Sequence, residues 1–178
     1  HYIFKLRAES ERNEIDVYTV EMDESKKKSE QWYVNTDVTY AFDGSKVTGS
    51  YGDATARAHA DTKWTQSEID AGEAPDGADT NTVKVEGLTT KLIRDVKSQA
   101  ANELIKTDWY ITRKSEKNTA IPSAITTHRD AVRSKQDSMC TAITNAADTP
   151  ALETLYTYVN TADEGDPVEM ERPIGDIP

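Results

Sequence analysis

Side chains that could bind a metal ion are few and scattered along this sequence. The three histidines stand too far apart for a local metal site: His1, His59 and His128. A single cysteine, Cys140, leaves no Cys-x-x-Cys pair and no intrachain disulfide. Asp76, Asp79 and Asn81 offer oxygen ligands for calcium, but their spacing does not match a calcium-binding loop. The sequence therefore predicts no metal-binding residue and no cofactor.

Nucleophilic and acid–base catalysis have no better support in the sequence. The Gly-x-Ser-x-Gly spacing of a nucleophile turn is absent from Gly49-Ser50-Tyr51-Gly52. No glycine-rich phosphate loop occurs. The chain has 32 carboxylates, so acidic pairs arise by chance and none can be nominated as acid and base. We predict no catalytic residue and a protein that is not an enzyme.

Charge divides the chain into three regions. Residues 1–87 carry 10 basic and 18 acidic side chains, residues 88–147 carry 10 and 6, and residues 148–178 carry 1 and 8. The net charge of −11 argues against nucleic acid as a partner, because phosphates need a cationic face. The basic middle is either a set of solvated helix faces or a patch that docks on acidic copies of the chain or on a partner.

The sequence predicts a small hydrophobic core. With 178 residues, the chain can form one domain or two small ones. Only 36% of its residues are hydrophobic and the mean hydropathy is −0.73, which suits surfaces completed by other subunits. No apolar stretch approaches the ~20 residues of a membrane span. The N-terminus lacks the form of a secretory signal. We expect a soluble protein with no membrane partner.

Strands dominate the structure expected for the first half. Apolar and aromatic residues alternate over residues 32–42, the strongest strand pattern in the chain. Residues 35–37 could instead bend this stretch into two short strands, because Asn and Asp favour turns. Asp43-Gly44 predicts a hairpin turn into a strand over 46–51. Further strands are expected over 2–6, 14–22 and 82–86.

Three aromatic residues share one face of the resulting sheet: Trp32, Tyr40 and Phe42. One interpretation is that this face is buried as part of the core. The alternative is an exposed face that binds sugar or protein. We therefore regard these three residues as candidates for a structural or interaction role.

Helices dominate the second half. Apolar residues recur at helical spacing from Leu88 to Leu104, and a second long helix is expected over 122–145. Joined by a short charged link, the two form an αα-hairpin. A short third helix is predicted over 151–158. The tail over 163–178 is acidic and holds three prolines, so we expect it to be disordered on its own.

These elements predict an α+β fold, with an N-terminal antiparallel β meander followed by a C-terminal αα-hairpin plus a short third helix. The expected regions are a β-rich domain over 1–87, a helical hairpin over 88–160 and an acidic, proline-containing tail over 161–178. Within the first region, residues 65–68 read Thr-Gln-Ser-Glu and fit a capping box that starts a short helix, followed by a loop over 71–81.

One stretch, over residues 98–146, has a more particular order. A helix of Leu and Ala ends in Thr-Asp-Trp, a polar link and a proline follow, and the second helix holds Arg-x-Ala-Val-Arg. The residues are Leu104, Thr107, Asp108, Trp109, Tyr110, Arg113, Pro122, Arg129, Ala131, Val132 and Arg133. This pattern resembles a C-terminal segment of small virion-associated and tail-assembly proteins of tailed bacteriophages, many of them marine.

The chain departs from that family pattern at two points. His128 stands where the family has an aromatic residue before the first arginine, and the Trp-Pro ending common among the tail-assembly chaperones is absent. Within the segment, we expect Trp109 to pack into the crook between the helices. Asp108 is expected to cap a helix or to pair with Arg129 or Arg133.

The resemblance implies a non-enzymatic structural or interaction component of a phage particle, in the tail, baseplate or fibre region. Its expected partners are other phage structural proteins or further copies of itself, in a virion assembled in the host cytoplasm. An alternative is a tail or tail-fibre assembly chaperone that does not stay in the virion. A second alternative, from a different class, is a glycan-binding or hydrolytic module that acts on the host surface.

Overall fold

The computed structural model describes residues 8, 12, 15, 17–164 and 166–178, and its fold is α+β, with N-terminal strands followed by C-terminal helices. The chain divides into two compact units, residues 1–57 and 58–178. This division comes earlier than the boundary predicted at residue 87. The strand expected over 2–6 lies outside the described residues.

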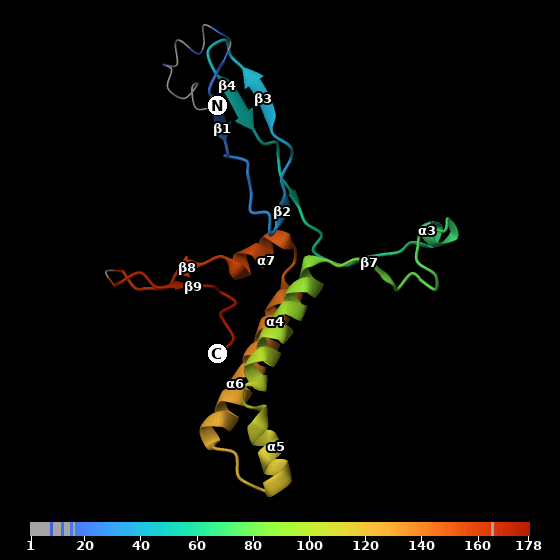
Figure 1. The fold of residues 1–178 in the computed structure, drawn as a ribbon, viewed down its shortest axis with the longest axis vertical. Coiled ribbons are helices and arrows are strands. Elements are labelled where there is room, and N and C mark those ends of the chain that lie inside the picture. Colours follow the sequence, from blue (N-terminus) through green and yellow to red (C-terminus); the bar gives the residue numbers. More distant parts are fainter. Residues whose placement is uncertain (1–7, 9–11, 13–14, 16, 165) are drawn as a thin grey trace. The chain divides into compact units, whose positions relative to one another are not determined.

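A three-stranded sheet forms in the first unit. Its strands are β1 (Val20–Asp23), β3 (Thr39–Phe42) and β4 (Val47–Ser50), in the order β1-β4-β3 (Figure 1). β3 and β4 are antiparallel and joined through the predicted turn, where Gly44 has a φ of 98°. β1, however, runs parallel to β4, so the prediction of an all-antiparallel meander is wrong. Strand patterns specify the strand and its buried face, whereas the partner is chosen by contacts distant in sequence.

The predicted bend divides the alternating stretch 32–42 into two strands. The first, β2 (Tyr33–Val34), pairs antiparallel with β5 (Thr55–Ala56), and the second is β3. Asn35 fixes the bend, because its side chain accepts from the Lys28 N–H at 2.9 Å and donates to the Lys28 carbonyl at 2.8 Å. These bonds satisfy Lys28 in place of a continuing strand ladder. The alternative of two short strands is therefore confirmed.

The second unit begins with a small β–α–β arm. It comprises β6 (Thr62–Lys63), α3 (Gln66–Asp70) and β7 (Val83–Val85), with β6 and β7 antiparallel. The capping box predicted from residues 65–68 is confirmed, since Thr65 and Glu68 exchange side-chain to backbone hydrogen bonds. Glu68 also pairs with Lys84 on β7, and the Lys84 ammonium lies 4.6 Å from the centre of the Trp64 ring.

Acid should loosen this arm at the pair of Glu68 and Lys84. The Lys84 hydrogen bond, and then the Thr65 backbone N–H, lower the pKa of Glu68 from 4.5 to about 2. A carboxyl whose folded pKa is depressed stabilises the fold above its ordinary pKa, and this stabilisation is lost as the pH falls from about 4.5 towards 2. NMR should show the Glu68 carboxyl titrating near pH 2, with the Trp64 indole signal following it. In Glu68→Gln the Trp64 transition should vanish, and a midpoint near 4.5 in the parent would contradict the assignment.

Two long helices, α4 (Leu88–Ile105) and α6 (Ser123–Asn145), lie side by side and form the predicted hairpin (Figure 1). Their facing stripes supply most of the buried side chains of this unit. On α4 the buried residues are Leu88, Leu92, Val96 and Ala100, and the apolar ones on α6 are Val132, Met139 and Ile143. Helical periodicity identified these positions because one face of each helix is buried against the other.

The start of α4 is held by the segment over residues 58–61. The carbonyls of Ala58 and His59 accept from the N–H groups of the first helical residues, Leu88 at 2.9 Å and Thr89 at 3.1 Å. The Asp61 carboxylate accepts from the Gly87 N–H at 2.7 Å and from the Thr90 hydroxyl at 2.9 Å. These bonds satisfy donors that a helix N-terminus otherwise leaves free. They also explain why the compact unit begins at residue 58.

The short charged link expected between the two long helices contains a helix of its own, which the sequence pattern did not predict. α5 (Asp108–Lys117) begins after a break at Lys106 and Thr107 and ends at Asn118, whose φ of 49° is left-handed. Asp108 in its first turn and Lys114 and Lys117 in its last turn complement the helix dipole. The local charge pattern thus favours a helix within the link.

The acidic tail, which was expected to be disordered on its own, is anchored to the chain's own helices. After α7 (Thr149–Tyr156), strands β8 (Val159–Asn160) and β9 (Met170–Glu171) form an antiparallel hairpin. Beyond it, Ile174 is buried, and its N–H donates to the Leu155 carbonyl on α7 at 3.0 Å. The Arg172 guanidinium lies 5.7 Å from the rings of both Tyr156 and Tyr158. One buried apolar side chain and one cation close to two aromatic rings hold a segment whose composition indicates disorder.

Among the described helices, none combines the length and the apolar character needed to cross a membrane.

Candidate functional site

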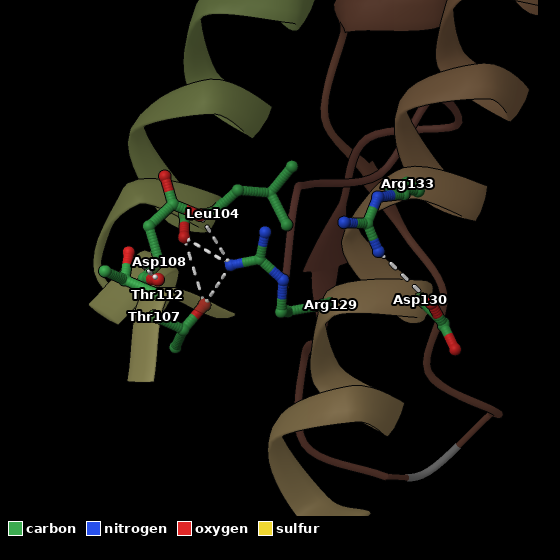
Figure 2. A network of polar contacts seen from close by, with 7 residues as sticks. All are labelled: Leu104, Thr107, Asp108, Thr112, Arg129, Asp130 and Arg133. Carbon is green, nitrogen blue, oxygen red and sulfur yellow. Dashed lines mark hydrogen bonds and ion pairs between the residues drawn. The ribbon is translucent and has the colours of Figure 1, made fainter. Parts of the chain in front are cut away.

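Arg129 joins the three helices of the hairpin at one point (Figure 2). Its Nη1 donates to the Leu104 carbonyl at 2.8 Å and to the Thr107 hydroxyl at 2.7 Å, and it forms an ion pair with Asp108 Oδ1 at 2.8 Å. Leu104 is in the last turn of α4, Thr107 is the residue before α5, and Asp108 begins α5. One side chain from α6 therefore fixes both the end of α4 and the start of α5.

The position of Arg129 on α6 explains its burial. It precedes buried Val132 by three residues on the apolar stripe, and it is only 7% exposed. A buried guanidinium needs acceptors, and the carbonyl end of α4 supplies one together with the negative end of the helix dipole. Asp108 at the positive end of α5 supplies the balancing carboxylate, with its own side chain 54% exposed.

Arg133, four residues further along α6, has a different environment. Its side chain is 50% exposed and pairs only with Asp130 on the same helix, at 3.2 Å (Figure 2). Of the two arginines that could pair with Asp108, the structure therefore selects Arg129. The Arg129 contacts can position helices but cannot transfer protons, because a guanidinium stays protonated at any ordinary pH.

A second polar cluster lies beside this junction. Glu103 on α4 pairs with Lys106 and lies 3.3 Å from His128 Nε2. The Lys106 hydrogen bond, followed by the smaller contribution of His128, lowers the pKa of Glu103. His128 therefore serves as a second link between α6 and the end of α4, at the position where the phage family pattern has an aromatic residue.

Trp109 is exposed, so the expectation that it packs between the helices is wrong. Its side chain is 51% accessible, and its ring lies 3.8 Å from that of Tyr110 and 5.7 Å from the Arg113 guanidinium. Arg129 occupies the crook in its place. Sequence could not distinguish the two, because a helix of ten residues with no buried side chain offers no apolar stripe to orient the ring.

Replacing Trp109 with alanine should therefore leave the free energy of unfolding within ~0.5 kcal/mol of the parent, because exposed side chains contribute little to stability. Urea denaturation followed by circular dichroism measures this directly. Val132→Ala is the matched comparison on α6, since Val132 is 0% exposed and its truncation leaves a cavity that should cost about 1–3 kcal/mol. Equal losses in the two variants would show that Trp109 is buried after all.

Two of the three aromatic candidates in the first unit form an exposed apolar face. In the register of the sheet, Val20 and Phe42 flank Val47, and Met22 and Tyr40 flank Gly49, so all lie on one face. Tyr40 is 64% and Phe42 53% exposed, and the interpretation of these two as core is wrong. Trp32, by contrast, is buried and belongs to the turn that precedes β2.

The described residues offer little support for a metal-binding site. Asp79 Oδ1 accepts from the Asn81 N–H and from the Thr82 N–H and hydroxyl, which makes it a local turn. Within the part of the chain that the structure describes, no three acidic, histidine or cysteine side chains lie close enough to share a metal ion. The Asp76–Asn81 loop is thus held by its own hydrogen bonds.

Several contacts that hold the second unit together could not be predicted from the sequence. Asp61 and Gly87 meet across the arm, and Arg172 and Ile174 anchor the tail. Each is a single residue in a polar stretch, without periodicity or a motif. A buried Arg129 could have been suspected, because it falls on the apolar stripe of α6.

Comparisons of the chain with protein-family models, with curated proteins and with solved structures gave no match.

Proposed function

We propose that this chain is a non-enzymatic structural component of a tailed-phage particle, in the tail, baseplate or fibre region, and that it acts through protein–protein contacts. The observation that carries this proposal is the distribution of apolar side chains. Among the described residues, more large hydrophobic side chains are exposed than are buried. They gather on particular elements, and contiguous exposed apolar surface marks sites of interaction.

Three elements carry most of that exposed apolar surface. The first is the face of the N-terminal sheet with Tyr40 and Phe42, the second is the end of α4 with α5, and the third is the β8–β9 hairpin. Each of the last two projects side chains from an element that has few buried residues of its own. A chain that presents several separate contact surfaces suits a scaffold within an assembly better than a catalyst with one concave site.

The phage assignment rests on the resemblance of residues 98–146, and the structure gives those residues a coherent role. Asp108 and Arg129 form the junction of the hairpin, while Trp109 and Arg113 lie on its surface. A motif that combines a buried arginine at the junction with an exposed aromatic residue is suited to fixing the hairpin and presenting its end to a partner. This reasoning supports the proposal for the hairpin region.

Quantitative mass spectrometry of purified particles tests the proposal. The chain should be found in the particles at a constant ratio to the major tail proteins, and should survive a salt wash that removes loosely bound protein. Its presence in infected cells but not in particles would overturn the structural role in favour of the assembly-chaperone alternative. Its absence from both, together with binding on a glycan array, would favour the host-surface alternative.

A further inference from the structure

The β8–β9 hairpin has one apolar and one acidic face. Pairing of Val159 with Glu171 and of Asn160 with Met170 places alternate residues on opposite sides of the ladder. Tyr158, Val168 and Met170 fall on one side and are 56%, 71% and 53% exposed. Residues 158–171 carry five carboxylates and no basic side chain. A two-stranded hairpin is only marginally stable in water, so this surface gains from a partner.

The tip of the helical hairpin has the opposite charge. Trp109, Tyr110 and Arg113 form a continuous surface through their ring contacts. Lys114 and Lys117 extend it along α5, and these two lysines and Arg113 take part in none of the ion pairs formed among the described residues. Trp, Tyr and Arg are the residues most enriched at the energetic centres of interfaces. We call Trp109, Tyr110, Arg113, Lys114 and Lys117 the tip surface.

We propose that the tip surface binds the β8–β9 hairpin of a second copy of this chain. Both surfaces expose large apolar side chains, and their charges are opposite, with cations on the tip surface and carboxylates on the hairpin. In the part of the chain that the structure describes, the carboxylates Glu164, Asp166, Glu169 and Glu171 likewise take part in no ion pair. Glu169 and Glu171 lie on the face opposite Val168 and Met170, so opposite charge steers and orients the approach while the apolar face makes the contact.

The two surfaces are different, so their contact joins copies head to tail. A head-to-tail contact continues into a ring or an open chain of copies, because each copy still has one free surface of each kind. The average mass in solution should therefore rise with protein concentration. This inference deepens the proposed function by naming the partner. It rests on that function only in requiring that the chain act through protein contacts.

Charge exchange between the two surfaces tests the contact. The tip variant is Lys114→Glu with Lys117→Glu, and the hairpin variant is Glu169→Lys with Glu171→Lys. Each should weaken self-association, measured by sedimentation velocity at matched concentrations, by ~10-fold or more, because attraction becomes repulsion. The exchange variant combines all four changes, keeps the net charge, and should associate again at low salt.

A mixture of the tip variant with the hairpin variant should associate again, into alternating copies of the two. The native hairpin of the tip variant can bind the native tip of the hairpin variant, and the acidic tip of the first variant can bind the basic hairpin of the second, as in the exchange variant. Lys91→Glu with Lys97→Glu, two exposed lysines of α4, is the matched control and should associate as the parent does. Circular dichroism confirms that every variant is folded.

Three outcomes would overturn the inference. They are a parent that stays monomeric up to ~100 µM, an unchanged association in either single-surface variant, and an exchange variant that does not recover. A protein that self-associates as expected but is missing from phage particles would uphold this contact while overturning the proposed function. The two conclusions therefore fail separately.

Discussion

Arg129→Ala should lower the free energy of unfolding by about 2–4 kcal/mol, the largest effect expected of any single polar side chain here. The change removes two hydrogen bonds from a charged donor, so the Leu104 carbonyl and the Thr107 hydroxyl, which also bond to each other, each have one partner fewer. The ion pair with Asp108 adds little to the estimate, because water reaches that carboxylate and screens it. Urea denaturation gives the free energy, and amide exchange in α5 should accelerate most.

Arg133→Ala is the matched control for this experiment. It removes the same side chain from the same helix, one turn away, where the group is half exposed and pairs only within α6. Its cost should stay below ~0.5 kcal/mol. Arg129→Met should fall between the two, because it keeps the buried stem and also removes Nε, which is buried without a hydrogen-bond partner. Equal losses for the two alanine variants would show that Arg129 does not hold the junction.

Gly87→Ala should destabilise the protein by roughly 2–3 kcal/mol through a backbone clash. A Cβ atom at this position would overlap the backbone carbonyl of Ala60 and the carbonyl oxygen of His59, neither of which can rotate away. The direction of the change in stability is informative, because two effects of Gly87→Ala oppose each other. Gly87 has an ordinary φ of −75°, so alanine would by itself stabilise the chain by about 0.4–1 kcal/mol through the unfolded state. A loss therefore measures how closely residues 58–61 approach the start of α4.

Gly72→Ala separates this clash from backbone strain. Gly72 has a left-handed φ of 74°, and a Cβ there would meet nothing within 4 Å. Its replacement should cost only the ~1 kcal/mol of a left-handed alanine. Thermal unfolding of the two variants and the parent measures whether Gly87→Ala costs more stability than Gly72→Ala. A Gly87→Ala protein as stable as the parent would mean that the 58–61 segment is not held against the helix.

Sequence patterns predicted the helical part of this fold well, because its signals are local and repeated. Leu88, Leu92, Val96 and Ala100 each fall on the stripe that the structure buries, and residues 65–68 form the capping box that their order predicts. In both cases several residues within a few turns specify the same element. The bend at residues 35–37 was predicted as one of two alternatives, and its cause is a single side chain, Asn35.

What the sequence did not predict depends on one residue meeting a distant one. The parallel pairing of β1 with β4 joins strands separated by residues 24–46, which include β2 and β3, and strand patterns contain no information about such partners. The tail is fixed by Ile174 and Arg172 within an acidic stretch whose composition indicates disorder. The same holds for Trp109, which was expected between the helices but is exposed, while Arg129 is buried there. Burial there was decided by which side chain could satisfy the end of α4.

The bonds between residues 58–61 and the start of α4 have a practical consequence for the arm. They bring both ends of the arm to one place, so residues 62–86 leave the helical unit and return to it at the same point. Lengthening a segment whose two ends are held together costs little free energy of folding, since the entropy of loop closure grows only with the logarithm of the loop length. The loop over 71–81 is therefore a place to insert an affinity tag or fluorescent label. The label would report on the chain inside an assembly while both the tip surface and the β8–β9 hairpin stay free.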